Sequence, residues 1–320
     1  MPKVLIIQPF HDNGMALLKA RADITYEIVD GSSIEEMQAK IVDADGVTIR
    51  TALLPAEVLD RGERLKVVSR HGVGFDNVDL DCLNRRGIAM ALTTDANATS
   101  VAEHVLFMML HLAKQGVRFD RATRTDDWAR RNSLETIDIG GRHILIIGFG
   151  RIGKEVAKLC QAFRMRISVH DPYVSDDVIQ AAGCRPVGDF RAVLGETDIV
   201  TLHMPLTETT RDMIGEAELS ALPDHALLIN CARGGLVDEA ALHAALTSGG
   251  IAGAGLDVFE QEPPPHAHPL FALENVILSP HSAGLTQECA KRMAVSTVKN
   301  VLDGIDGKLN PAVVVNKEVL

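Results

Sequence analysis

Short apolar runs alternate with longer mixed stretches along the chain, and this alternation predicts strands separated by helices. In the first hundred residues the runs fall at residues 4–7, 24–29, 46–49, 65–69 and 88–92. A second series comprises residues 143–147, 167–170, 199–203, 226–230, 252–257 and 276–279. Strands that alternate with helices form parallel sheets with helices on both faces. The pattern therefore predicts an α/β protein.

Two longer helical patterns flank the second series of strands. Residues 99–114 are apolar on almost every side, which is typical of a buried helix, and Ser100 with Glu103 predicts a capping box at its start. The pattern at residues 287–302 begins after the last strand. It can return the chain to the first domain, which would make that domain discontinuous.

Composition narrows the class of protein. A chain of 320 residues predicts two domains, and 46% hydrophobic with 4% aromatic residues predicts a mainly aliphatic core. The formal net charge of −11 argues against a nucleic-acid-binding surface. No apolar stretch is long enough to span a bilayer, and residues 1–10 are typical of a buried strand rather than a signal peptide. The five scattered cysteines form no disulfide framework and no metal-ligand spacing, so we expect a cytoplasmic protein without a metal site.

A glycine-rich loop, Gly148-Phe149-Gly150-Arg151-Ile152-Gly153, follows the clearest strand and opens a helix. Its glycines allow a tight turn and a close approach of the backbone to a pyrophosphate, which the helix N-terminus also attracts. The next strand ends at Asp171, before Pro172, where this motif calls for an acid. Asp171 can accept hydrogen bonds from ribose hydroxyls and would repel a 2′-phosphate, which favours NAD over NADP. The alternative is that Asp171 merely ends a strand.

Three segments after later strands carry reactive side chains. Arg233 follows a buried strand beside two glycines, and its planar fork matches a carboxylate or carbonyl oxygen. Glu262 precedes a proline-rich loop, and His281 follows the last strand. Oxidation of an alcohol by hydride transfer needs a base for the hydroxyl proton; a histidine backed by a carboxylate suits that task.

These motifs together resemble those of the D-isomer-specific 2-hydroxyacid dehydrogenase family, and the resemblance covers essentially the whole chain. The matching segments are residues 71–79, 97–103, 148–153, 203–207 and 233–239 with the Glu262 and His281 segments. The resemblance implies a Rossmann cofactor domain and a flavodoxin-like substrate domain, both doubly wound, with a cleft between them. It implies a substrate domain of residues 1–98 plus 287–320, an NAD-binding domain of residues 99–286, and a homodimer formed through the cofactor domain.

The resemblance also implies roles for single residues. Arg233, Glu262 and His281 would be catalytic, with Arg233 on the substrate carboxylate and carbonyl and His281 as acid/base. Substrate would also meet Arg50, Val73, Gly74 and Asn97. The cofactor would be NAD, bound by Gly148, Gly150, Arg151, Ile152, Gly153, Asp171, Pro172, His203, Thr207, Cys231, Ala232, Asp257 and Gly284.

The expected substrate is a small 2-hydroxy or 2-oxo acid, either 3-phosphoglycerate/phosphohydroxypyruvate or hydroxypyruvate/glyoxylate. Arg50 is a candidate for binding a phosphate or second carboxylate, although a solvated arginine explains it equally well, and residues 69–71 add local positive charge. The alternatives are a phosphite-type dehydrogenase or a non-catalytic, NAD-sensing, corepressor-like protein. Formate is disfavoured because related formate dehydrogenases have glutamine where this chain has Glu262. The short stretch after the last helix leads us to expect no regulatory amino-acid-binding domain.

Overall fold

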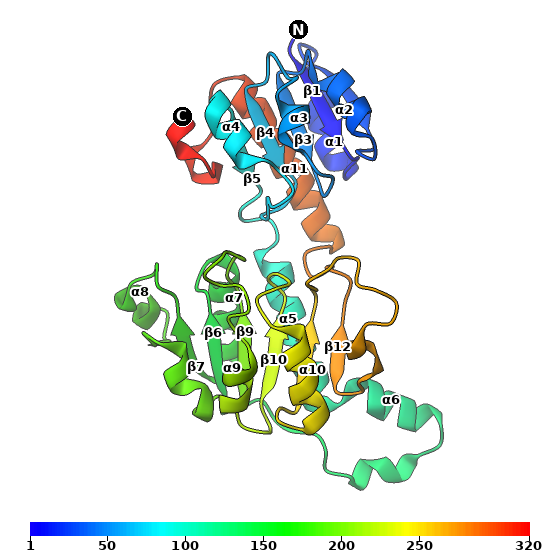
Figure 1. The fold of residues 1–320 in the computed structure, drawn as a ribbon, viewed down its shortest axis with the longest axis vertical. Helices are drawn as coiled ribbons and strands as arrows, with labels where there is room; N and C mark the ends of the chain where they lie inside the picture. The colour runs from blue at the N-terminus through cyan, green and yellow to red at the C-terminus, as the bar shows by residue number, and fades with distance from the viewer. The chain divides into compact units, whose positions relative to one another are not determined.

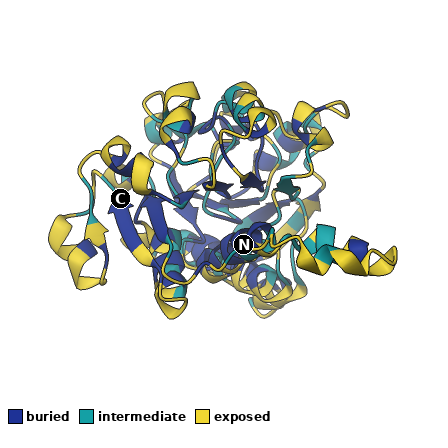
Figure 2. Cartoon of the chain, turned by 90° about the horizontal axis from the view of Figure 1, so that it is seen from below, coloured by how far each residue is buried: buried dark blue, intermediate teal, exposed yellow.

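The computed structural model describes residues 1–320 and divides the chain into two compact units (Figure 1). Unit 1 comprises Met1–Asn97 and Leu285–Leu320, and unit 2 comprises Ala98–Gly284. Each unit has its own parallel sheet. Most strand residues are buried, except in strands at the edges of the two sheets, and exposed residues gather on the outer sides of helices and on loops (Figure 2).

Unit 1 contains a five-stranded parallel sheet in the order β2-β1-β3-β4-β5. This is the flavodoxin-like order, in which the sheet grows in both directions from its first strand. The strands are β1 (Lys3–Ile7), β2 (Thr25–Val29), β3 (Gly46–Ile49), β4 (Val67–Arg70) and β5 (Ala89–Leu92).

Helices cover both faces of the unit 1 sheet because residues of each strand point alternately to the two sides. Apolar residues of α2 (Ile34–Ile41), α3 (Ala56–Leu59) and α4 (Leu80–Arg86) pack with Leu5 and Ile7 on one face. Residues of α1 (Asp12–Lys19) and α11 (Gln287–Ile305) pack with Val4 and Ile6 on the other. The last long helix is therefore an integral layer of the first unit.

Unit 2 contains a seven-stranded parallel sheet in the order β12-β11-β10-β9-β6-β7-β8. The chain adds strands on one side of β6 and then crosses to add β9 on the other, which is the Rossmann order with one further strand. The strands are β6 (His143–Ile147), β7 (Arg166–His170), β8 (Arg185–Pro186), β9 (Ile199–Leu202), β10 (Leu227–Asn230), β11 (Gly253–Leu256) and β12 (Val276–Leu278). The strand order reverses between β6 and β9, and doubly wound α/β sheets bind their ligands at the carboxyl ends of the strands at such a point.

Two helical layers enclose the unit 2 sheet. Helices α5 (Ala98–Lys114), α7 (Arg151–Ala162) and α8 (Asp176–Ala181) contribute to one core cluster, and α9 (Glu216–Ala221) and α10 (Glu239–Ser248) contribute to the other. The 3-10 helices η2 (Phe190–Glu196) and η3 (Pro269–Ala272) add to the second cluster. In neither unit is any helix of the length and apolar character that crossing a bilayer requires.

The predicted fold class, two doubly wound α/β sheets, is confirmed, but some local predictions are wrong. Helix α5 begins at Ala98, so Ser100 is buried inside its first turn and cannot be the residue that precedes and caps it. The apolar face begins earlier than the cap signal suggests, since Ala98 is already buried. Helix α6 (Gly116–Arg124) and the 3-10 helix η1 (Trp128–Asn132) were not predicted, and Ala122 is their sole buried residue.

Candidate active site

The glycine-rich loop connects β6 to α7 and leaves no room for larger residues at two positions. A Cβ on Gly148, whose φ is +98°, would lie 2.5 Å from the carbonyl oxygen of His203. A Cβ on Gly153 would lie 2.1 Å from the carbonyl oxygen of Gly148. Gly150 is the residue before the helix, and no side chain caps the helix there. A Cβ added to Gly150 would have no atom within 4 Å. The helix N-terminus therefore presents backbone N–H groups to open space, as a phosphate site requires.

Asp171 follows β7 and holds the glycine-rich loop. Its Oδ2 accepts a hydrogen bond from the Phe149 N–H at 2.6 Å, and its Oδ1 accepts one from the Tyr173 N–H at 2.8 Å. A carboxylate has about four lone-pair sites, so the side chain can accept further hydrogen bonds from ribose hydroxyls. Its contact with the loop was not foreseen from the sequence, because the motif assigns the acid to the ligand alone.

His281 and Glu262 form a hydrogen-bonded pair with 2.7 Å between Nδ1 and Oε2. The other carboxylate oxygen, Oε1, accepts the backbone N–H of Phe259 at 3.1 Å, so the carboxylate joins the imidazole to the loop after β11. The side chains are 50% and 37% exposed respectively. Because Nδ1 is engaged by Glu262, Nε2 is the ring nitrogen that remains for a substrate.

Asp257 anchors the loop that carries His281. Its side chain is 1% exposed, and its carbonyl oxygen accepts the His281 N–H at 2.8 Å. The carboxylate accepts hydrogen bonds from the hydroxyl of Ser279 and from the N–H groups of Ser282 at 2.8 Å and Ala283 at 2.9 Å. His281 itself has φ +51°, a backbone conformation that costs free energy and persists only when its surroundings hold it.

Arg233 follows β10 in a turn that Asn230 closes. Asn230 donates from Nδ2 to the Arg233 carbonyl oxygen at 2.8 Å and accepts the Ala232 N–H at 3.0 Å. The guanidinium of Arg233 donates to the Ala232 carbonyl oxygen at 2.6 Å. A Cβ on Gly234 would lie 1.8 Å from the carbonyl oxygen of Phe259, so the two loops touch through their backbones.

The three strands before these segments, β10, β11 and β12, are parallel neighbours in the sheet. Their carboxyl ends lie on one edge of the sheet, and the structure thus brings Arg233, Asp257 and His281 to that edge. Three residues that hold the site were missed from the sequence: Asn230, Ser279 and His104, whose Nε2 lies 2.9 Å from Ser279 Oγ. A polar side chain at the end of an apolar strand was the available signal for the first two.

Two predicted cofactor contacts, His203 and Cys231, have uncharged side chains near neutral pH. Burial lowers the pKa of His203 to about 3, so its ring is uncharged near neutral pH; Nε2 lies 2.9 Å from Thr201 Oγ1, and Nδ1 has no hydrogen-bond partner. Burial also raises the pKa of Cys231, which keeps it a thiol. The remaining predicted contacts lie at the start of α7 (Arg151, Ile152), after Asp171 (Pro172), in the loops after β9 and β10 (Thr207, Ala232) and at the last residue of unit 2 (Gly284).

The predicted substrate residues other than Arg233 and His281 belong to unit 1 and follow its strands. Arg50 follows β3 and donates from Nη1 to the Pro9 carbonyl oxygen at 2.8 Å. Val73 and Gly74 lie in the turn after β4, and Asn97, the last residue of this part of the unit, has a buried Oδ1 without a hydrogen-bond partner.

The prediction of positive charge at residues 69–71 is only partly right. Burial, and then the charge of Arg50, lower the pKa of His71 to about 4. His71 is therefore uncharged near neutral pH, stacked on Phe10 with 5.9 Å between ring centroids. The positive charge here comes from the arginines.

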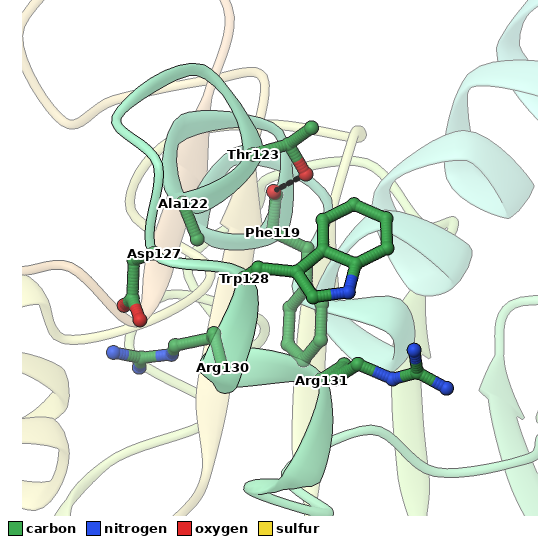
Figure 3. A pocket seen from close by; sticks show the side chains of 7 residues that line it. All are labelled: Phe119, Ala122, Thr123, Asp127, Trp128, Arg130 and Arg131. Atoms are coloured by element: carbon green, nitrogen blue, oxygen red, sulfur yellow. Dashed lines mark hydrogen bonds between the residues drawn. The ribbon is translucent and has the colours of Figure 1, made fainter.

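A surface hollow of about 380 Å³ lies on α6 and η1 (Figure 3). It is lined by Phe119, Ala122, Thr123, Asp127, Trp128, Arg130 and Arg131. None of these residues belongs to the site described above, and the hollow contains no histidine that could transfer a proton. We therefore locate the candidate active site at the sheet edge rather than in the hollow.

The Rossmann strand order, the glycine-rich loop and Asp171 define a dinucleotide-binding α/β protein. Comparison with known proteins agrees: residues 106–283 match the family described as D-isomer specific 2-hydroxyacid dehydrogenase, NAD binding domain. The chain is 37% identical over 325 residues to the glyoxylate reductase of Thermofilum pendens, covering all of this chain and 96% of that protein. D-lactate dehydrogenase from Aquifex aeolicus, solved with NAD and lactic acid, superposes with a TM-score of 0.85 at 29% identity and covers 98% of both chains.

The chain belongs to the D-isomer specific 2-hydroxyacid dehydrogenase family. This confirms the predicted family and its cofactor, NAD. The D-3-phosphoglycerate dehydrogenase of Methanocaldococcus jannaschii is 36% identical over 315 residues, which are 98% of this chain. The chain spans 59% of the length of that relative.

Proposed function

We propose that the protein is an NAD-dependent dehydrogenase that transfers hydride between the nicotinamide and C2 of a small 2-hydroxy or 2-oxo acid. The observation that carries this proposal is the 2.7 Å contact between His281 Nδ1 and Glu262 Oε2, on the sheet edge that also bears Arg233. A histidine with one nitrogen bound to a carboxylate and the other available is an acid/base of the kind that alcohol oxidation requires.

NAD, when bound, supplies the hydride acceptor, and its reduced form supplies the donor. In the reducing direction, protonated His281 gives its Nε2 proton to the carbonyl oxygen of the substrate. Glu262 holds the ring through Nδ1 and stabilises the charged form. Arg233 binds the carboxylate and polarises the carbonyl, for which its fork of N–H donors is suited. Asp171 and the N-terminus of α7 bind the ribose and the pyrophosphate.

We assign the NAD-binding role to unit 2 and the substrate-binding role to unit 1, where Val73 and Gly74 offer backbone N–H groups and Asn97 a side-chain amide. The substrate class is glyoxylate and hydroxypyruvate or phosphohydroxypyruvate, on the strength of relatives named glyoxylate reductase and D-3-phosphoglycerate dehydrogenase. Arg50 is the candidate for binding the phosphate.

The test is a panel of glyoxylate, hydroxypyruvate, phosphohydroxypyruvate, pyruvate and larger branched 2-oxo acids with NADH and with NADPH. We expect turnover of at least one of the first three acids, faster with NADH, and a rise of KM for phosphohydroxypyruvate alone in an Arg50→Ala variant. Absence of turnover with every acid would contradict the proposed activity. Oxidation of phosphite with NAD in place of 2-oxo acid reduction would support the phosphite-type alternative.

We further propose a cytoplasmic homodimer formed through unit 2. Large apolar side chains on this unit are exposed around α6 and η1, with Val117 61%, Trp128 67% and Leu134 87% exposed. A second copy would bury them.

The five cysteines are all free and buried, which suits a reducing compartment. Light scattering on a size-exclusion column should give a mass of two chains for the wild type. In the Trp128→Glu variant the measured mass should fall towards that of a single chain. A wild-type mass of 34.5 kDa, which is the mass of one chain, would contradict the dimer.

A further inference from the structure

A second histidine–carboxylate pair lies beside the loop that carries Glu262. His268 precedes η3, Glu239 begins α10, and His268 Nε2 lies 2.9 Å from Glu239 Oε2. Their side chains are 9% and 15% exposed, so this pair is much more buried than His281 and Glu262. Nothing in the proposed reaction uses it.

The hydrogen bonds of the pair fix its orientation. His268 Nδ1 accepts the Leu270 N–H at 3.3 Å, which leaves Nε2 to carry the ring hydrogen and donate it to Glu239. The other oxygen of Glu239, Oε1, accepts the backbone N–H of Glu260 at 2.8 Å. Glu239 therefore connects α10 and His268 to a residue two positions before Glu262.

The segment that Glu239 holds is confined on its other sides too. The ring of Phe259 packs against His268 and Phe271 with centroids 5.6 and 6.1 Å apart, and both contacts are edge-on. The carbonyl oxygen of Phe259 abuts Gly234, and its N–H donates to Glu262 Oε1. Any movement of this segment thus displaces the carboxylate that contacts His281.

We infer that Glu239 and His268 are a positioning pair: they fix residues 259–260 so that Glu262 stays within hydrogen-bonding distance of His281. The inference rests on the proposed function, because it names what holds the catalytic carboxylate in place. Neither residue touches substrate or cofactor; both act through Glu262.

Two substitutions of His268 separate this role from general stability. His268→Leu removes the N–H donor, whereas His268→Gln places an amide N–H near the position of Nε2. We expect kcat for 2-oxo acid reduction to fall about tenfold in His268→Leu, because displacement of a catalytic group by a fraction of an ångström has effects of this order. The KM for NADH should stay the same, and His268→Gln should recover most of the loss.

A matched control is His225, whose side chain is 50% exposed and whose Nε2 lies 3.0 Å from Asp198 Oδ1 on the same unit. His225→Leu should leave kcat unchanged. The decisive comparison is the double variant with Glu262→Gln: if His268 acts through Glu262, His268→Leu causes little further loss once that carboxylate is gone. Equal losses in both backgrounds, or a His268→Leu enzyme with wild-type kcat, overturn the inference.

Hydrogen exchange gives a readout that does not depend on turnover. The amides of Phe259 and Glu260 should exchange faster in His268→Leu than in wild type and His268→Gln, while the amides of β6 stay unchanged. Unaltered exchange at both amides overturns the positioning role even if the wild type proves inactive. If the wild-type enzyme turns over 2-oxo acids but exchange is unaltered in His268→Leu, only the positioning role of the pair is refuted. If the wild-type enzyme shows no turnover but exchange is faster in His268→Leu, only the proposed activity is refuted.

Discussion

Gly234→Ala tests how closely the loops of Arg233 and Glu262 depend on each other. The added Cβ would lie 1.8 Å from the carbonyl oxygen, 2.1 Å from the carbonyl carbon of Phe259 and 2.7 Å from the nitrogen of Glu260. All three are backbone atoms, so no flexible side chain can move aside. The backbone at Gly234 itself lies outside the left-handed region, and an alanine is strained only by this contact.

The two segments must therefore separate by roughly 1 Å before the contact becomes tolerable, and a misplacement of this size costs about 10²-fold in rate when it affects catalytic groups. Overpacking costs about 1–3 kcal/mol, which leaves a domain of ordinary stability folded. We expect kcat/KM for the best 2-oxo acid to fall about 10²-fold, with a thermal midpoint lower by several degrees.

The assay follows NADH absorbance in initial-rate measurements, with thermal melting of the same samples. Gly188→Ala is the control, because a Cβ there has no atom within 4 Å and its φ is not positive. A Gly234→Ala enzyme with a rate within twofold of the control and an unchanged midpoint would refute the reasoning, since the loops would then have moved apart without consequence.

Three further predictions concern single side chains. His281→Ala should lower kcat by about 10²–10⁴-fold with NADH binding by fluorescence unchanged, and near-normal turnover would remove His281 from the mechanism. Asp171→Ala should weaken NADH binding about 10–100-fold, reduce the preference for NADH over NADPH and loosen the Phe149 loop. An unchanged ratio of NADH to NADPH affinity would show that Asp171 does not bind the ribose. Stability in urea should fall as the pH drops from about 6.5 towards 4, because the folded-state pKa of His71 lies at about 4 and the unfolded chain takes up the proton first. His71→Phe should remove about 3 kcal/mol of that dependence, leaving a part from His203; equal slopes in both proteins would contradict the assignment.

The fold could be predicted from the sequence because apolar residues are spaced differently in strands and in helices, and because the glycine-rich loop follows a strand. The predicted strands match the observed ones to within two residues at each end, as at His143–Ile147. Helix α6 and η1 were not predicted, because the segment is strongly polar and buries only one residue, so it carries no broad apolar face.

The candidate site was predictable where a chemical group must touch a ligand and unpredictable where it touches only protein. Arg233, Glu262 and His281 stand out because ionisable side chains are unexpected so soon after apolar strands. Glu239, with His268, gave no such signal, since a glutamate at the start of a helix is ordinary. Their pairing spans 29 residues and exists only in the folded chain.

The place of α11 in unit 1 has a consequence for the order in which the protein is made. Strands β1 to β5 leave the ribosome early, but one face of their sheet is completed by Val298, Val301 and Ile305, which are synthesised after all of unit 2. Gly46 and Gly304 mark the tightness of that packing, since a Cβ on either would clash with Val301 or Val67. Unit 2 is one continuous segment, so its core can form as soon as that segment has been synthesised. Until α11 is made, one apolar face of the sheet in residues 1–97 stays uncovered. We therefore expect unit 2 to fold before unit 1 during translation, and unit 1 to be most prone to aggregation or chaperone binding before α11 has been synthesised.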